Sequence, residues 1–328
     1  MSKLFVIGSN SFSGSSFVDY ALEQGAETIG ISRSQEPVAA LLPYKWRPHQ
    51  QFSFHQLDLN AHLPEIMALI KEFEPTYVVN FAAQSMVAES WRTPGDWFMT
   101  NAVSTIKLHD ELRKCDFIKR YVHVSTPEVY GTCSGFVKED FPFNPSTPYA
   151  VSRAAADMSL RTFHSAYNFP VVTTRAANVY GPGQQLYRII PRTILFIMLG
   201  RKLQLHGGGS STRSFIHMKD VSDATWRIME KGDSGSSYHI STEEVVSIRE
   251  LVERICQKLE VRFEDHVEVV GERLGKDAAY QLDSSKLRGE LGWQDRLNLD
   301  QGLDECIAWV RTHFDTLKAQ SYDYQHKP

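Results

Sequence analysis

The first half of this chain alternates short apolar runs, rich in β-branched and aromatic residues, with longer amphipathic stretches. Six of these runs are predicted strands, at residues 3–8, 27–32, 52–57, 76–82, 120–125 and 170–176. Near-continuous apolar strands that alternate with helices are typical of a parallel sheet covered on both faces. The sequence therefore predicts an α/β fold with a doubly wound parallel sheet, in which ligands bind beyond the carboxyl ends of the strands.

The alternation ends near Asn178, where loops rich in glycine begin. We therefore predict a dinucleotide-binding domain in residues 1–178, to which a strand and helix in residues 214–231 return. Residues 179–328 are predicted to form mainly a smaller mixed α/β lobe that binds the substrate, with a helical tail from Ser247 onward. No low-complexity linker separates the two lobes, so we expect them to pack together.

Charge and cysteine content exclude several classes of protein. A net charge of −4 and a pI near 6.3 indicate no basic surface for nucleic acid or an anionic membrane. The longest apolar run is interrupted by Pro191 and Arg192 and is too short to cross a bilayer. Four scattered cysteines without a C-x-x-C pair argue against a structural zinc site and fit a reducing compartment. We expect a cytoplasmic protein that binds small molecules and no metal.

The stretch VIGSNSFSGSSF, residues 6–17, joins the first predicted strand to a predicted helix with the pattern Gly8-x-x-Ser11-x-x-Gly14. In a dinucleotide-binding loop the first glycine permits a tight turn and the last allows close packing of helix and strand, while the helix N-terminus binds a pyrophosphate. Ser11 replaces the middle glycine, so we expect it to shift the pyrophosphate slightly or to donate its hydroxyl to it. An ordinary strand-to-helix turn remains the alternative for this motif alone.

Several motifs follow this loop in order: FAAQSMV, STPEVYG, YAVSR, NVYGPG and RLGKD. With the loop, they make the chain resemble the extended short-chain dehydrogenases, and most closely the nucleotide-sugar 4,6-dehydratases, from Lys3 to about Trp293. The resemblance implies a tightly held nicotinamide cofactor and a substrate in which a sugar is linked to a nucleoside diphosphate. The cofactor-binding residues that it implies are Gly8, Asn10, Ser11, Phe12, Ser13, Gly14, Ser32, Arg33, Asp58, Leu59, Ala82, Ala83, Gln84, Tyr149 and Arg153.

Tyr149 and Arg153 have the spacing of the family's Tyr-x-x-x-Lys pair, one helical turn apart. A phenol acts as a base near neutrality only if a nearby cation stabilises its phenolate, and a guanidinium supplies that charge without the compact shape of lysine. By resemblance, Thr126 hydrogen-bonds the sugar O4 and Glu128 takes the C5 proton. Many relatives have an aspartic acid at Pro127, so we expect Glu128 itself to return the proton to the departing C6 hydroxyl.

The second predicted strand ends at Ser32, and Arg33 follows it. NAD-specific loops usually have an acidic residue at this place, so we expect NADP rather than NAD. The resemblance implies substrate contacts at Ser85, Thr126, Glu128, Asn178, Arg213 and Arg273. A nucleotide-sugar 4-epimerase or 4-reductase is the alternative enzyme, and a non-catalytic cofactor-binding sensor is a further one. The carboxylate of Glu128 favours the dehydratase.

The resemblance also implies a homodimer built through a four-helix bundle. Predicted helices at residues 100–115 and 149–167 have apolar residues at helical spacing, and the second has an alanine-rich face suited to close helix contact. Both helices could instead pack only on their own sheet, so the spacing alone does not decide between these arrangements.

Overall fold

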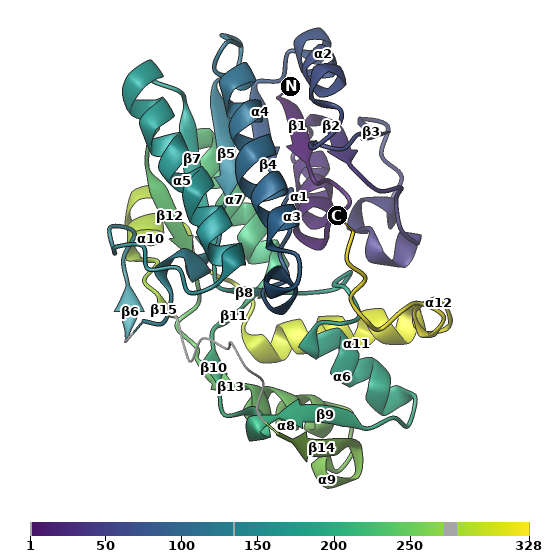
Figure 1. The fold of residues 1–328 in the computed structure, drawn as a ribbon. Helices are drawn as coiled ribbons and strands as arrows, with labels where there is room; N and C mark the ends of the chain where they lie inside the picture. Colours follow the sequence, from purple (N-terminus) through teal and green to yellow (C-terminus); the bar gives the residue numbers. More distant parts are fainter. Residues whose placement is uncertain (1, 134, 272–280, 328) are drawn as a thin grey trace.

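The computed structural model describes residues 2–133, 135–271 and 281–327, and its centre is a seven-stranded parallel sheet of order β12-β7-β5-β4-β1-β2-β3 (Figure 1). The predicted fold class is confirmed. All six predicted strands are present within two residues at either end: β1 (Lys3–Ile7), β2 (Glu27–Ser32), β3 (Phe52–Gln56), β4 (Tyr77–Asn80), β5 (Arg120–Val124) and β7 (Val171–Ala176). The seventh, β12 (Ser237–Ile240), was not predicted; it pairs in parallel with β7.

Side chains of the central strands alternate between two apolar layers, as the two-residue period of a strand requires. Leu4 and Val6 of β1 pack on one face with α1 (Phe12–Glu23) and α7 (Met218–Lys231), which contact each other. Phe5 and Ile7 pack on the opposite face. The helices on that face are α2 (Leu63–Phe73), α4 (Thr105–Leu112) and α5 (Pro148–Tyr167).

The helix predicted at residues 100–115 differs in detail from the observed one. A short helix, α3 (Pro94–Phe98), continues through a π-helical stretch (Met99–Ser104) into α4. Both α3 and the π-helical stretch contact α5. The outer faces of these helices therefore lie beside each other on one side of the molecule.

A second apolar core lies below the sheet in Figure 1, and Ile194, Leu205, Leu251 and Leu303 are among its residues. Its main elements are α6 (Ile189–Met198), β9 (Leu203–His206), α8 (Ile248–Lys258), β14 (Val267–Val270) and α11 (Leu299–Thr312). The tail from Ser247 onward is mostly helical, as predicted, but it also contains β14, which was not predicted and pairs in parallel with β9.

Short elements complete the described residues. Three small pairings join β8 (Asn178–Tyr180) to β11 (Phe215–His217), β10 (Thr212–Arg213) to β13 (Val246–Ser247), and β6 (Phe136–Val137) to β15 (Gln281–Leu282). The remaining helices are α9 (Phe263–His266), α10 (Ser285–Leu291) and α12 (Phe314–Lys318). Within the ranges that the structure describes, no helix combines the length and the apolar character that crossing a bilayer demands.

The two cores are joined by buried and partly buried hydrogen bonds. The Trp309 indole of α11 donates to the Ala40 carbonyl in the loop after β2, over 2.9 Å. The Asp220 carboxylate of α7 accepts from the backbone N–H groups of Arg296 and Leu297, over 3.0 and 3.1 Å. These contacts place the second core directly against the carboxyl ends of the sheet strands.

Candidate active site

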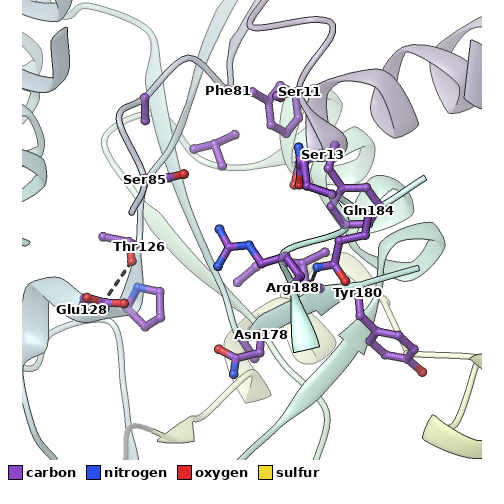
Figure 2. A pocket seen from close by; sticks show the side chains of 18 of the residues that line it. Ser11, Ser13, Phe81, Ser85, Thr126, Glu128, Asn178, Tyr180, Gln184 and Arg188 are labelled. Atoms are coloured by element: carbon purple, nitrogen blue, oxygen red, sulfur yellow. Dashed lines mark hydrogen bonds between the residues drawn. The ribbon is translucent and has the colours of Figure 1, made fainter. Parts of the chain in front are cut away.

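A cavity of about 370 Å³ lies at the carboxyl ends of β1, β4 and β5 (Figure 2). Ten of the residues predicted from the sequence line it, and they come from the loop after β1, the loops after β4 and β5, α5 and β8: Ser11, Phe12, Ser13, Ala83, Ser85, Thr126, Glu128, Tyr149, Arg153 and Asn178. The volume is in the range of small-molecule sites. The structure therefore brings the predicted catalytic residues and part of the predicted cofactor loop into one cavity.

The loop after β1 is closed by Ser11 itself. Ser11 is the N-cap of α1: its hydroxyl accepts from the Gly14 N–H over 3.1 Å and donates to the Gly8 carbonyl over 2.7 Å. The hydroxyl proton is thus donated to the loop backbone, whereas the sequence left open a slight shift of the pyrophosphate or donation of this hydroxyl to it. Gly8 has a φ of +82°, and a Cβ there would lie 2.7 Å from the Ala82 nitrogen. The loop therefore keeps the tight turn of a dinucleotide-binding motif despite the serine.

The loops after β1 and β2 are tied together by Asn10. Its side chain donates to the Ser34 carbonyl over 2.8 Å, and its backbone N–H donates to the Ser32 hydroxyl over 3.1 Å. Arg33 donates from Nη1 to the Lys327 carbonyl over 2.8 Å. These predicted residues form one polar edge beside the cavity.

Other predicted residues lie outside the cavity lining. Asp58 accepts from the Asn60 N–H over 2.8 Å, next to the buried Leu59. The Gln84 side chain is buried and donates to the Lys327 carbonyl over 2.6 Å. Arg213 lies on β10, and Arg273 falls outside the described residues.

Thr126, at the end of β5, starts the short helical turn Pro127–Tyr130. Its hydroxyl accepts from the Glu128 N–H over 3.3 Å, the contact drawn as a dashed line in Figure 2. Pro127 stands at the first position of this turn, where its restricted φ fits and its missing N–H is not needed. The turn thereby holds the Glu128 carboxylate in the same cavity as Tyr149.

Arg153 lines the same cavity as Tyr149 and Glu128 and is only 2% exposed. Its guanidinium donates to the Val124 carbonyl, and Nη2 lies 3.4 Å from His123 Nε2. Burial lowers the pKa of His123 well below its usual value, with the Arg153 charge next in effect, so the imidazole is neutral and accepts from the guanidinium. Arg153 is thus fixed in place by the end of β5.

The pKa of the Tyr149 phenol is raised above its ordinary value of 10.0 by burial. The positive charge of Arg153 and a hydrogen bond with Thr126 act in the opposite direction, whereas the negative charge of Glu128 raises the pKa further. Arg153 therefore favours the phenolate, as expected from the sequence, but does not outweigh burial.

Sequence reasoning did not single out Gln184, Tyr187 and Arg188, which also line the cavity. They come just after the NVYGPG motif, and this closeness to a predicted site motif is the sequence signal that could have identified them. Figure 2 shows the Arg188 guanidinium pointing into the cavity, opposite Thr126 and Glu128. The cavity therefore contains a guanidinium, that of Arg188, that no motif predicted. Among the described residues, no cluster of three or more histidine, cysteine or acidic side chains is arranged as a metal site.

A doubly wound sheet with a glycine loop at its first strand and a Tyr-x-x-x-Arg helix beside its active edge defines an extended short-chain dehydrogenase/reductase. Within this class the chain belongs to the GDP-mannose 4,6-dehydratase family, whose sequence profile matches residues 5–306. The dTDP-glucose 4,6-dehydratase of Haemophilus influenzae is 30% identical to it over 333 residues, which are 94% of this chain and 98% of the relative.

Solved structures of two enzyme types share the fold. DesIV, the dTDP-glucose 4,6-dehydratase of Streptomyces venezuelae solved with NAD, has a TM-score of 0.88 at 30% identity, covering 96% of this chain and 98% of its own. The UDP-glucose 4-epimerase of Thermotoga maritima, solved with UDP-glucose, has a TM-score of 0.86 at 25% identity, covering 95% and 99%. The predicted family is confirmed, and these relatives support the predicted nucleotide-sugar 4,6-dehydratase activity more strongly than the 4-epimerase alternative.

Proposed function

We propose that this chain is an NAD(P)-dependent nucleotide-sugar 4,6-dehydratase, which forms a nucleoside-diphosphate 4-keto-6-deoxy sugar. The observation that carries the proposal is the position of Glu128, in one cavity with Tyr149 and Thr126. Loss of water across C5 and C6 needs a base for the C5 proton, whereas a simple 4-epimerase has no such requirement. The similarity to dTDP-glucose 4,6-dehydratases over nearly the whole chain supports the same activity.

The residues of the loop after β1 fit a dinucleotide. A Cβ at Gly8 or Gly14 would collide with backbone atoms, so the tight turn and the close packing of α1 against it need glycine at both positions. The first turn of α1 directs N–H groups outward, which suits a pyrophosphate. A bound nicotinamide would supply hydride chemistry, accepting a hydride from the sugar C4 and returning it to C6.

The protein's own residues would carry the protons. Tyr149, as phenolate, takes the proton of the O4 hydroxyl, with Thr126 hydrogen-bonded to O4 and the Arg153 charge favouring the phenolate. Oxidation at C4 acidifies C5, and Glu128 removes the C5 proton. Since Pro127 cannot donate, the Glu128 carboxylic acid gives that proton to the C6 hydroxyl, which leaves as water. When the hydride returns to C6, C5 takes a proton from solvent, and Tyr149 releases to solvent the proton that it took from O4.

We assign the binding of the substrate pyrophosphate to Arg188, with Ser85 and Asn178 as neighbouring polar groups in the cavity. A planar guanidinium donates two parallel hydrogen bonds to phosphate oxygens. Arg213 and Arg273 stay as further candidates for the same role, as the resemblance implies.

The decisive experiment follows a deuterium label from C4 of candidate nucleotide sugars. A dehydratase must deliver the label to C6 of the product, as mass spectrometry would show. Glu128→Gln is expected to lower the elimination rate by about 10²–10⁴-fold while oxidation at C4 continues, so reduced nicotinamide accumulates and absorbs near 340 nm. Tyr149→Phe is the matched control, because it blocks the first hydride transfer. Turnover of Glu128→Gln at the parent rate would favour the epimerase or reductase.

For the cofactor, we propose a preference for NADP over NAD. Ser32 and Arg33 place no carboxylate against a 2′-phosphate, and a guanidinium pairs well with phosphate. Titration with NADPH and NADH measures the preference directly; NADH binding as tightly as NADPH would overturn it.

We also propose that the chain forms a homodimer through the outer faces of α5 and of the continuous helix formed by α3, the π-helical stretch Met99–Ser104 and α4. Large apolar side chains are exposed there, among them Phe98, Met99, Val103, Val151 and Met158. Exposed apolar residues gathered on neighbouring helices are typical of an interface. Sedimentation at micromolar concentrations tests the proposal, and a species of only 37.3 kDa would overturn it.

A further inference from the structure

Residues 322–327, which follow α12, run from the second core to α3 as an extended segment, drawn in yellow in Figure 1. Burial alternates along this segment: Tyr322, Tyr324 and His326 are partly buried, whereas Asp323, Gln325 and Lys327 are exposed. A two-residue period is typical of an extended chain with one face packed on the protein. The segment is therefore docked along its length.

Three aromatic side chains anchor the docked face. The Tyr322 ring lies 5.7 Å from the Phe196 ring of α6. The Tyr324 ring lies 5.5 Å from the ring of Tyr187, a residue that lines the active-site cavity. The first two anchors thus hold the segment to the second core.

The third anchor lies on the other side of the cavity. The His326 ring stacks on Trp97 of α3, with centroids 4.8 Å apart and planes 11° apart. His326 Nε2 also lies 2.7 Å from the Asp96 carboxylate. The segment therefore crosses from α6 to α3 and connects the two parts of the molecule between which the cavity opens.

Beyond His326, the segment contacts the predicted adenosine end of the cofactor site. The Lys327 carbonyl accepts hydrogen bonds from Arg33 Nη1 over 2.8 Å and from Gln84 Nε2 over 2.6 Å. Lys327 Nζ donates to the Ser34 hydroxyl over 3.1 Å. Two residues that the family resemblance assigns to the cofactor are thus engaged by a segment about 240 to 290 positions away in the sequence.

We propose that residues 322–327 are a further part of the cofactor site and form a strap that controls exchange of the dinucleotide. The strap rests on the cofactor position given under Proposed function. Docked, it covers the edge formed by Arg33 and Gln84; lifted, it opens that edge to solvent. A dehydratase that regenerates its cofactor in each turnover has no need to release it, so a closed strap retains the dinucleotide without slowing the reaction.

The strap is tested by locking it. All four native cysteines are buried, so thiols introduced by Asp96→Cys and His326→Cys can be bridged selectively with a short, reducible bis-methanethiosulfonate. NADH fluorescence then follows two processes: binding to protein stripped of cofactor, and release from loaded protein during a chase with excess NAD. Each single-cysteine variant treated with the same reagent is the matched control.

Bridging is expected to slow both binding and release at least tenfold, and a reducing agent should restore the rates of the unbridged protein. Tyr324→Ala, which removes a middle anchor, should speed release. Equal rates in the bridged and reduced proteins would overturn the strap alone. Failure of loaded protein to accept the bridge, when stripped protein accepts it, would also overturn it, because the segment would then occupy the place of the cofactor. Failure of the stripped parent protein to bind either NADH or NADPH would overturn the proposed cofactor site as well.

Discussion

Gly14→Ala tests whether the loop after β1 needs glycine for steric reasons. A Cβ at Gly14 would lie 2.1 Å from the Gly8 carbonyl oxygen, which falls 1.3 Å short of the 3.4 Å where ordinary contact begins. The obstructing atom belongs to the backbone, so the turn itself must move. That movement disturbs the Gly8 carbonyl, which accepts from both the N–H and the hydroxyl of Ser11. Overpacking costs about 1–3 kcal/mol, and loss of the Ser11 cap costs about 1 kcal/mol more.

Urea denaturation measures the free energy of unfolding of Gly14→Ala, and titration with NADH measures its cofactor affinity. We expect the stability loss above and at least a tenfold weaker affinity, which corresponds to about 1.4 kcal/mol. Gly95→Ala in α3 is the matched control, because a Cβ there meets no atom within 4 Å. A Gly14→Ala protein with the stability and affinity of the parent would refute the steric argument.

Three further outcomes are expected. Burial lowers the pKa of His239 to about 3, so between about pH 6.5 and pH 3 the unfolded chain binds a proton that the folded one does not. The contribution of His239 to the free energy of unfolding is therefore fully present above about pH 6.5, and it falls by about 1.4 kcal/mol per pH unit toward pH 3. Urea midpoints between pH 7.5 and 5 check the decline, which His239→Gln should reduce. Ser11→Ala should lower the free energy of unfolding by about 1 kcal/mol and Ser11→Gly by only a few tenths, and equal losses would contradict the capping role. Met158→Glu places a charge on a side chain that is 58% exposed on α5, and should convert a sedimenting dimer to monomer without lowering the thermal midpoint of the monomer.

The parallel sheet was predictable because its strands carry their own local signal. In β1, Leu4 to Ile7 are all apolar and buried, and β2 and β4 are buried along almost their whole length, so each is typical of a strand covered on both faces. β12 was missed because it has only four residues, and its partner β7 lies more than 60 positions earlier. β14 was missed because it also has only four residues, and two of them, Glu268 and Val269, are exposed. Such short strands depend on a distant partner for their hydrogen bonds.

The order of the motifs predicted which loops form the site, because the carboxyl ends of parallel strands meet at one edge. The family resemblance that the motifs carry implied that Thr126, Glu128 and Tyr149 belong to one site. They did not identify Arg188, which belongs to no motif, or the strap residues. The loop serine was predicted as a departure from the pattern, but its bond to the Gly8 carbonyl was not.

Local sequence determined the six predicted strands, the glycine turn and the chemical types gathered around the cavity, since each depends on backbone preference and on residues close along the chain. Tertiary structure alone decided that His123 and the Val124 carbonyl hold Arg153, that Arg188 enters the cavity, and that Lys327 meets Arg33 and Gln84. The physical reason is that a side chain's pKa, its hydrogen-bond partners and its access to solvent are set by groups brought close only when distant segments pack.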